Sequence, residues 1–528
     1  MRTATSRAAV VLGVLLLCGT QQVRAREAAG PNVLLVMCDD LCCALGSYGD
    51  ATALTPAIDG LASRGVRFER AYCQFPLCNP SRASMLTGRR PSRTRVRDNR
   101  LHFRDVDPRI VTLPEAFRGA GYRVERIGKL YHYGVPGQIG TDGLDDPPSW
   151  DAVFNPRGRD KADEALVFTL DPGKYGGTVS WLAADGTDGE QTDGLGATRA
   201  CERLEAFARD GTPFFLAVGF YRPHTPYVSP RAWFDRHPLD GVALPTVPEG
   251  HDATVPAGAI ASRKREQDRL RGDLGREAIR AYRSAVSFVD AQVGRVLDTL
   301  ERTGLADDTI VVFASDHGYH LGEHDLWQKM SLFEESARVP LVVALPPGFS
   351  GAAPGGTVCE QTVELVDVMP TLCDLAGVDL PVGTCDGRSL RPALVPEEGV
   401  PLEDRPAITE VAHGAKVRGV SLRTERYRYT EWNGGAGGLQ LYDHDTDPHE
   451  LENLAGRAEH ADTVERLRRL LGATAGDGAA AVPPAAAPAR APDVILILAD
   501  DLGFSDIGAY GRSEEHTSEL QSRQYLVC

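Results

Sequence analysis

The sequence predicts an α/β fold in which a sheet carries helices on both faces, followed by a smaller antiparallel sheet. Short runs rich in Val, Ile, Phe and Leu alternate along the chain with segments of helical periodicity. From about residue 405 to 445 this alternation gives way to short strands separated by turns. The first pattern is typical of strands buried between helices, and the second of a separate antiparallel sheet.

The apolar runs define the strands of the main sheet, and the first run is continuous, as in a strand buried on both faces. The predicted strands span 32–38, 122–127, 213–220, 309–315 and 339–345, and the predicted helices span 56–64, 276–303 and 361–376. In the longest helix Ile279, Tyr282 and Val286 begin an apolar series at steps of three and four, and Gly304 ends it. A helix at 461–471 closes the fold.

The N-terminus is predicted to lie outside the fold. Residues 1–25 combine a basic start, an apolar run and small residues before Ala25, which is the pattern of a secretory signal peptide. The apolar run is too short to span a bilayer comfortably, so we expect an exported protein, secreted or periplasmic, without a membrane span. Residues 26–400 then form the main α/β domain and residues 401–471 a C-terminal subdomain.

The C-terminal end contains a linker and an incomplete internal repeat. Residues 472–491 are rich in Ala, Pro and Gly, which predicts a linker. Residues 492–511 repeat the pattern of residues 31–49, with a proline, an apolar run, two aspartates and a Gly-x-Tyr-Gly turn. Residues 512–528 resemble the conceptual translation of a common sequencing adapter; a natural polar tail is the alternative. Residues 512–528 are therefore not expected to form part of the fold.

The composition is that of a globular protein with an acidic balance. Hydrophobic residues make up 42% and charged residues 25% of the 528 residues, which excludes a mainly disordered chain. Asp and Glu (73) exceed Lys and Arg (57), giving a net charge of −16. This charge argues against a nucleic-acid partner, which would require a basic surface. Among the cysteines, Cys359, Cys373 and Cys385 are candidates for one disulfide.

Polar clusters follow two of the predicted strands, where open α/β sheets place their ligand sites. Asp39 and Asp40 follow the first strand, and Asp316 and His317 follow strand 309–315. Either pair alone is more simply explained as the start of a loop or a helix cap. Three carboxylates at strand ends together favour a hard cation such as Ca²⁺, although the nitrogen of His317 is not a typical Ca²⁺ ligand.

A cysteine begins the segment Cys-Asn-Pro-Ser-Arg at residues 78–82. Pro80 favours a helix start, which places Cys78 at a helix N-terminus where free amides and the dipole favour an anion. A lone cysteine is more often a small buried apolar residue. The spacing of the proline and of Arg82 argues against that interpretation here.

Two further patterns are weaker. His320 and His324 suggest zinc, but the glutamate between them is not in the H-E-x-x-H position and Gly322 weakens the required helix. The arginines within residues 89–100 are most simply a solvated face. If they faced the site, they would attract an anionic substrate.

Several motifs occur together in a fixed order. They are C-x-P-S-R followed by Thr-Gly-Arg-Arg-Pro, IGKLYH (127–132), FYRPHTPY (220–227), SDHGYHLGEHDLWQK (315–329) and LYDHDTDPHELENL (441–454). With them, residues 30–455 resemble a type I, formylglycine-dependent sulfatase of the iduronate-2-sulfatase-like group. The resemblance implies an alkaline-phosphatase-like mixed sheet sandwiched by helices, with a smaller C-terminal antiparallel-sheet subdomain. Residues 492–511 resemble the start of a second sulfatase, truncated.

The resemblance also implies a nucleophile and a metal. Cys78 would be oxidised to formylglycine by a formylglycine-generating maturation enzyme, and a hydroxyl of the hydrated aldehyde would attack the sulfur of a sulfate ester. The implied Ca²⁺ ligands are Asp39, Asp40, position 78, Asp316 and His317. The cation would polarise a sulfate oxygen.

The remaining implied roles belong to basic residues. Arg82 would hold the formylglycine, and Lys129 and Lys329 would clamp sulfate oxygens. His132 would be the base that triggers sulfate release, and His224 the acid that protonates the leaving alcohol.

We therefore expect a sulfatase acting on a sulfated sugar or polysaccharide, with a 2-O-sulfated uronate suggested by the subgroup. One alternative is a phosphodiesterase or phosphonate hydrolase of the same superfamily, because the same hydrate and clamp can act on phosphorus. Another is a non-catalytic glycan-binding relic, which the loss of residues such as Lys129, His132 or His224 would have favoured. The stretch from Asp325 to Gln328 is a candidate for shaping substrate choice.

Overall fold

The computed structural model describes residues 30–381, 383–396 and 399–477. Its centre is a nine-stranded mixed sheet. In sheet order the strands are β12 (Arg338–Val339), β2 (Val66–Tyr72), β13 (Leu341–Ala344), β9 (Thr309–Ser315), β1 (Asn32–Asp39), β7 (Phe214–Pro223), β3 (Arg123–Gly128) and β4 (Ala152–Phe154), with β14 (Thr357–Glu364) beside β2. Strands β9, β1, β7, β3 and β4 are parallel, whereas β13 is antiparallel to both of its neighbours.

Strand β1 shows why the sheet has two covered faces. All of its residues are buried, and they alternate between two hydrophobic clusters. Val33 and Leu35 belong to one cluster, and Leu34 and Val36 to the other. This alternation is the period of two expected for a strand with a helix layer on each side.

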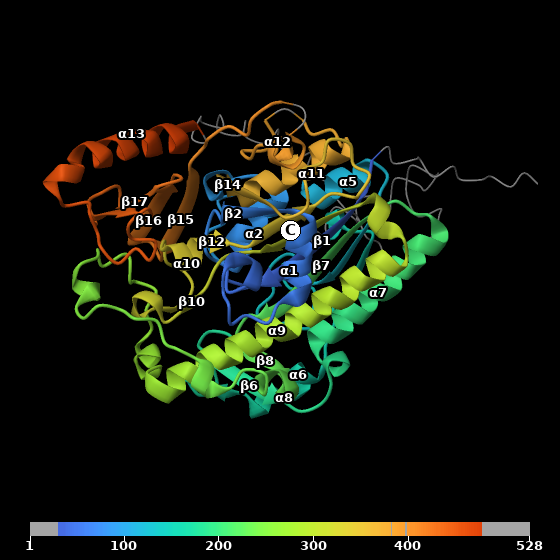
Figure 1. Ribbon diagram of the computed structural model, residues 1–528, viewed down its shortest axis with the longest axis horizontal. Helices are drawn as coiled ribbons and strands as arrows, with labels where there is room; N and C mark the ends of the chain where they lie inside the picture. The colour runs from blue at the N-terminus through green and yellow to red at the C-terminus, as the bar shows by residue number, and fades with distance from the viewer. Residues whose placement is uncertain (1–29, 382, 397–398, 478–528) are drawn as a thin grey trace, which may run out of the picture. The chain divides into compact units, whose positions relative to one another are not determined.

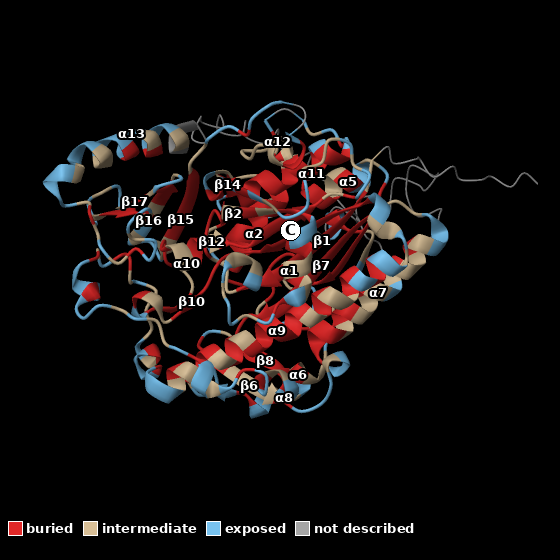
Figure 2. Ribbon diagram, in the orientation of Figure 1, coloured by how far each residue is buried: buried red, intermediate tan, exposed pale blue. Residues whose placement is uncertain are grey.

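Helices form the two outer layers (Figure 1). One layer contains α2 (Cys78–Thr87), α5 (Leu113–Gly119) and α11 (Val368–Ala376), and the other α1 (Pro56–Arg64), α7 (Thr192–Asp210) and α9 (Gly272–Arg302). Figure 2 shows the buried strands between the two layers, and exposed residues on α7 and near the ends of α9. The shorter helices are α3 (Pro91–Thr94), α4 (Phe103–Val106), α6 (Arg159–Ala162), α8 (Arg231–Phe234), α10 (Glu334–Ala337) and α12 (Arg391–Leu394).

Smaller sheets complete the structure. They are β5 (Phe168–Thr169) with β6 (Ser180–Ala184) and β8 (Tyr227–Pro230), the hairpin β10 (His320–Leu321) with β11 (Trp327–Gln328), and the C-terminal sheet β15 (Ala407–His413), β16 (Val417–Arg423), β17 (Tyr427–Trp432) and β18 (Leu439–Asp443). The C-terminal sheet is antiparallel throughout, and α13 (Ala461–Asp477) packs against it through Leu467. The predicted fold class is therefore confirmed.

Some predicted boundaries are wrong. Residues 361–376 are not one helix, because β14 runs to Glu364 and pairs in parallel with β2 before α11 begins at Val368. The strand predicted at 339–345 is divided at Pro340, which has no N–H to donate to a ladder. Helix α13 continues to Asp477, into the predicted linker.

The predicted signal peptide, the repeat and the adapter-like tail lie outside the described residues. Cys359, Cys373 and Cys385 are all free thiols, so the candidate disulfide is not formed. Within the described residues, no helix combines the length and apolar character needed to cross a bilayer.

Candidate active site

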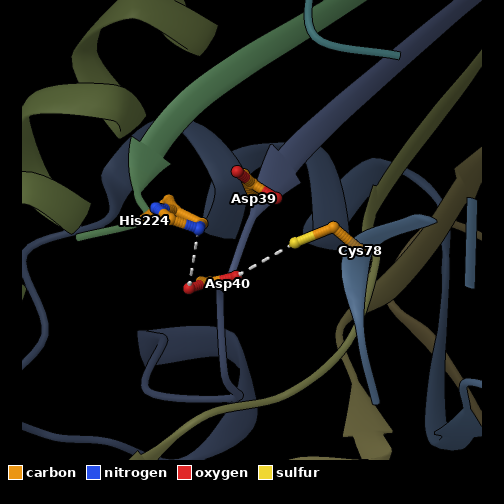
Figure 3. A group of neighbouring side chains, drawn as sticks. All are labelled: Asp39, Asp40, Cys78 and His224. Carbon is orange, nitrogen blue, oxygen red and sulfur yellow. Dashed lines mark hydrogen bonds and ion pairs between the residues drawn. The ribbon is translucent and has the colours of Figure 1, made fainter. Parts of the chain in front are cut away.

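The carboxyl ends of the central parallel strands meet at one edge of the sheet. Cys38 of β1 is opposite Ser315 of β9, and Asp39 is opposite Pro223 of β7. The polar residues that directly follow these strands are thereby brought together. Figure 3 shows Asp40 between His224 and Cys78, with Asp39 at the end of β1.

Cys78 is the first residue of α2 and is buried. Its Sγ lies 3.3 Å from Lys329 Nζ, 3.5 Å from His317 Nε2 and 3.8 Å from Asp40 Oδ1. Burial and Asp39 act to raise the pKa of the Cys78 thiol, but Lys129 and Lys329 outweigh them and lower it. The position at a helix start adds free amides and the positive end of the dipole.

Arg82 lies one turn further along α2 and joins the ends of three strands. Its Nε donates to Asp316 Oδ2 (2.9 Å), its Nη2 to Asp39 Oδ1 (3.0 Å) and its Nη1 to the carbonyl oxygen of Lys129 (2.7 Å). Lys129 Nζ pairs with the other oxygen of Asp39. Burial would raise the pKa of Asp39, but Lys129, His224 and Arg82 hold it well below its usual range.

Asp40 is held in an uncommon backbone conformation, with φ +64°. Its N–H donates to Asp316 Oδ1 (3.1 Å), and its Oδ1 pairs with Lys329 Nζ. Its Oδ2 is buried, lies 3.7 Å from His224 Nε2 and has no hydrogen-bond partner among the described residues. Burial raises the pKa of Asp40 to about 7 despite the nearby ammonium of Lys329.

The donor atoms are arranged as in a cation site. Asp39, Asp40, Cys78 and His224 each offer an atom within 4.8 Å of the others'. Cys78, Asp316 and His317 form a second group whose ligand atoms also lie within 4.8 Å of one another, and the two groups share position 78. Three of the six residues in the combined set are carboxylates, and the unpartnered Oδ2 of Asp40 is open for a ligand bond. The residues therefore fit a hard cation such as Ca²⁺.

Two histidines lie at the edge of this cluster and retain a little exposure. Burial and Lys129 lower the pKa of His132 to about 3, and burial with Lys329 lowers the pKa of His224 well below its usual range. His224 Nδ1 contacts the carbonyl oxygen of Thr225, so Nδ1 carries the proton and Nε2 faces Asp40. His132 Nδ1 has no hydrogen-bond partner within the described chain.

The structure thus brings every predicted site residue to one edge of the sheet. His320 and His324 do not lie on the helix that the zinc pattern requires. His320 is in β10, and His324 is in a turn with φ +58°. The arginines at 89–100 are largely paired rather than solvated: Arg90 is buried against Glu364, and Arg93 pairs with Asp386.

Sequence reasoning missed residues that position this cluster. The carboxylate of Asp193, in α7, accepts the N–H groups of Tyr221 (2.8 Å) and Arg222 (2.9 Å) at the end of β7. It thereby holds the turn that presents His224. Lys264 contacts Gln328, next to Lys329. No motif identifies Asp193 or Lys264, because each acts through contacts distant in sequence.

The amino-acid sequence matches the family described as Sulfatase over residues 31–378, which is more than half of the chain. The chain belongs to the sulfatase family. Residues 322–476 also match the family described as N-sulphoglucosamine sulphohydrolase, C-terminal. The chain is accordingly a type I sulfatase of the alkaline-phosphatase-like superfamily and a sulfuric ester hydrolase.

Individual relatives agree with this assignment. The sulfatase is 31% identical to iduronate 2-sulfatase of Mus musculus, over 83% of this chain and 93% of the relative. It is 33% identical to choline-sulfatase of Rhizobium meliloti, over 80% and 82%. Among solved structures it is similar to a 2-O GAG sulfatase, with a TM-score of 0.65, 26% identity and coverage of 85% and 92%.

Proposed function

We propose that this sulfatase cleaves a sulfate ester of a sulfated sugar, with formylglycine at position 78 as nucleophile and Ca²⁺ as cofactor. The observation that carries the proposal is the environment of Cys78. Cys78 is the first residue of the buried helix α2, and its side chain contacts Lys329, His317 and Asp40. Converted to formylglycine and hydrated, position 78 would supply one hydroxyl to attack sulfur and a second to expel sulfate.

The basic residues account for binding of the sulfate group. Lys129 pairs with Asp39 and Lys329 pairs with Asp40, and both ammonium groups act to lower the pKa of the Cys78 thiol. A sulfate entering the site would draw both ammonium groups toward its oxygens, where charge shifts in the transition state. Arg82, fixed by Asp39 and Asp316, keeps position 78 oriented by holding α2 against the strand ends.

The histidines account for proton transfer. His224 Nδ1 donates its proton to the carbonyl oxygen of Thr225, and the lowered pKa of His224 leaves Nε2 without a proton at the start. Nε2 would take up the proton lost by the attacking hydroxyl and give it to the leaving alcohol. His132 is neutral because burial and Lys129 lower its pKa, and a neutral imidazole is a base able to remove a hydroxyl proton at position 78.

Asp39, Asp40, Asp316 and His317 would hold Ca²⁺ together with position 78. When bound, the cation would supply Lewis-acid polarisation of a sulfate oxygen. The support is the three carboxylates gathered around position 78 and the unpartnered Asp40 Oδ2.

A sulfated carbohydrate substrate is supported by relatives whose names state iduronate 2-sulfatase and 2-O GAG sulfatase. These names favour a 2-O-sulfated uronate. Residues 1–25, read as a signal peptide, support a secreted or periplasmic location, and the cysteine of C-x-P-S-R supports a formylglycine-generating maturation enzyme as partner.

A phosphorus substrate is the second candidate. The structure is similar to a phosphonate monoester hydrolase of Agrobacterium radiobacter, with a TM-score of 0.70, 26% identity and coverage of 85% and 96%. The sulfatase family match and the sulfatase relatives above 30% identity favour sulfur.

The test is a mass measurement on the peptide containing position 78, in protein produced with a formylglycine-generating enzyme, beside turnover of 4-nitrophenyl sulfate. Conversion lowers the mass by about 18 Da, because CH₂SH becomes the CHO group that hydrates to the nucleophile. We expect converted protein to release sulfate and Cys78→Ala to release none. Converted, calcium-loaded protein that cleaves phosphonate esters but no sulfate ester would overturn the proposal.

A further inference from the structure

A further, half-buried cation, Lys264, lies next to Lys329 of the proposed sulfate clamp. Lys264 precedes the short helical turn at Arg265–Arg269, and its ammonium contacts the side-chain oxygen of Gln328 and the carbonyl oxygen of Gly177. Both acceptors are neutral. Within the described part of the chain no carboxylate lies at ion-pair distance from Lys264. The neighbouring Glu266 instead accepts from Thr178 Oγ1 (3.1 Å).

Lys264 lies between the loop that contains Lys329 and the segment that supports His224. Gln328 directly precedes Lys329, the proposed sulfate clamp. Gly177 directly precedes Thr178, whose carbonyl accepts from Thr225 Oγ1 (2.9 Å), and Thr225 directly follows His224. The ammonium of Lys264 therefore connects the loop of the proposed acid to the loop of the clamp.

The electrostatic surroundings agree with this position. Burial lowers the pKa of Lys264, Glu266 and Asp40 act to raise it, and Lys329 lowers it. A lysine ammonium has three N–H donors, and two neutral acceptors leave one of them for another partner. A half-buried cation without a carboxylate is the arrangement that an incoming anion completes, since charge-assisted hydrogen bonds strengthen when water is excluded.

We propose that Lys264 forms a second anion subsite, which binds an anionic oxygen group of the substrate other than the sulfate that is cleaved. The subsite would take the carboxylate of a uronate or a second sulfate on the same sugar unit. Gln328 holds the ammonium in place, because Gln267 Nε2 also donates to Gln328 Oε1 (3.2 Å) and keeps that oxygen turned toward Lys264. The inference rests on the proposed sulfatase site and adds a reason why anionic sugars would be preferred.

The test uses matched pairs of sulfate esters that differ in the second anionic group alone. One pair is a 2-O-sulfated uronate disaccharide and its carboxyl-reduced counterpart; the other is glucosamine 2-N,6-O-disulfate and N-acetylglucosamine 6-O-sulfate, which is neutral at the 2-position. For each pair the preference ratio is kcat/KM of the anionic member divided by kcat/KM of the other. The variants are Lys264→Gln, Lys264→Arg and, as control, Lys174→Gln, which removes a nearby exposed charge already paired with Asp171.

We expect the wild-type protein to prefer the anionic member of at least one pair, and the pair that shows it distinguishes carboxylate from sulfate. Lys264→Gln should lower that ratio by about tenfold, the loss typical of one charge-assisted hydrogen bond. Lys264→Arg should retain most of the preference, and Lys174→Gln all of it.

Two outcomes would overturn the subsite. Either the wild type shows no preference in either pair, or Lys264→Gln keeps the preference ratio. The second outcome includes an equal loss of kcat/KM for both members of a pair, which a merely structural tie between the loops would cause. Absence of turnover of every sulfate ester, 4-nitrophenyl sulfate included, in converted protein would instead overturn the proposed function itself.

Discussion

The ammonium nitrogen of Lys329 lies 3.3 Å from Cys78 Sγ, although the two residues are 251 positions apart in the sequence. Lys329 is flanked by Gln328 and Met330, which have φ +74° and +73°. Such left-handed conformations are costly for residues other than glycine, and they persist where the surrounding structure enforces them. The backbone on both sides of Lys329 is therefore shaped to aim its ammonium at position 78.

Replacement of Lys329 tests this relationship. We expect Lys329→Met to lower kcat on 4-nitrophenyl sulfate by about 10²–10³-fold, the range seen when one preorganised transition-state contact is removed. Steady-state kinetics on protein with measured formylglycine content checks this, with the exposed Lys174→Met as control. A variant that raises KM and keeps kcat would show that Lys329 binds ground state and transition state equally.

Calcium should stabilise the folded protein through Asp40. Its buried Oδ2 has no hydrogen-bond partner within the described residues, so a bound cation adds a contact that the unfolded chain lacks. At a concentration 100 times Kd, a ligand specific for the folded state adds about 2.7 kcal/mol to the free energy of unfolding. Thermal unfolding of chelator-treated protein, with and without CaCl₂, measures the increase in Tm.

Two variants distinguish this site from unspecific binding. Asp40→Asn should lose most of the calcium-dependent increase in Tm, whereas Asp171→Asn, at a half-buried position outside the proposed ligand set, should keep it. An equal increase in wild type and Asp40→Asn would contradict the assignment of Asp40 as a ligand.

The strands and helices predicted best were those whose pattern is local. The helix at 56–64 and the strand at 309–315 have the predicted bounds, because helical and apolar periodicity are properties of the segment itself. Residues 361–364 were predicted as helix and are strand, because pairing with β2, nearly 300 residues away, decides their conformation. Sequence periodicity carries no information about such a partner.

The residues of the site also differ in whether a local sequence pattern could identify them. The residues at strand ends, such as Asp39 and His317, were found because strand ends of a parallel sheet meet at one edge. Lys264 was not predicted from the sequence, because its segment is a polar stretch typical of a solvated loop. Its role depends on Gly177 and Gln328, 87 and 64 residues away.

The C-terminal sheet should support catalysis through Trp432. This buried side chain packs with Leu332 and Phe333, which follow Lys329, and with Phe75, which precedes Cys78. We expect Trp432→Ala to lower the free energy of unfolding by about 3–5 kcal/mol and also to lower kcat of the folded protein, because the Lys329 loop loses its support. Urea unfolding and kinetics at saturating calcium measure the two effects.

Leu467→Ala is the matched control for Trp432→Ala. Leu467 is buried between α13 and the C-terminal sheet, in a different cluster from Trp432. It should destabilise the protein without changing kcat per folded molecule. Equal kcat in the two variants would mean that the sheet has no part in positioning Lys329.

Glu364 should make stability depend on pH in the acid range. Its carboxylate is buried and accepts from Arg90 Nη1 (2.7 Å), Arg405 Nη2 (2.8 Å) and the N–H of Ile408 (2.9 Å). Burial would raise the pKa of Glu364, but Arg90 and Arg405 lower it to about 2. Because an unfolded glutamate has a pKa of about 4.3, its contribution is complete above that pH and is lost as pH falls toward 2.

Glu364→Gln should therefore cost about 3 kcal/mol in the free energy of unfolding at pH 7, since it leaves the buried guanidinium of Arg90 without its carboxylate and Arg405 with Asp367 alone. The difference from wild type should narrow progressively as pH falls below about 4.3, where protonation of the unfolded glutamate removes the wild-type advantage. Urea unfolding at a series of pH values measures it, with Glu360→Gln on the exposed side of the same strand as control. A difference that stays constant from pH 7 to pH 4 and below would show that the loss comes from altered packing and not from the charge of Glu364.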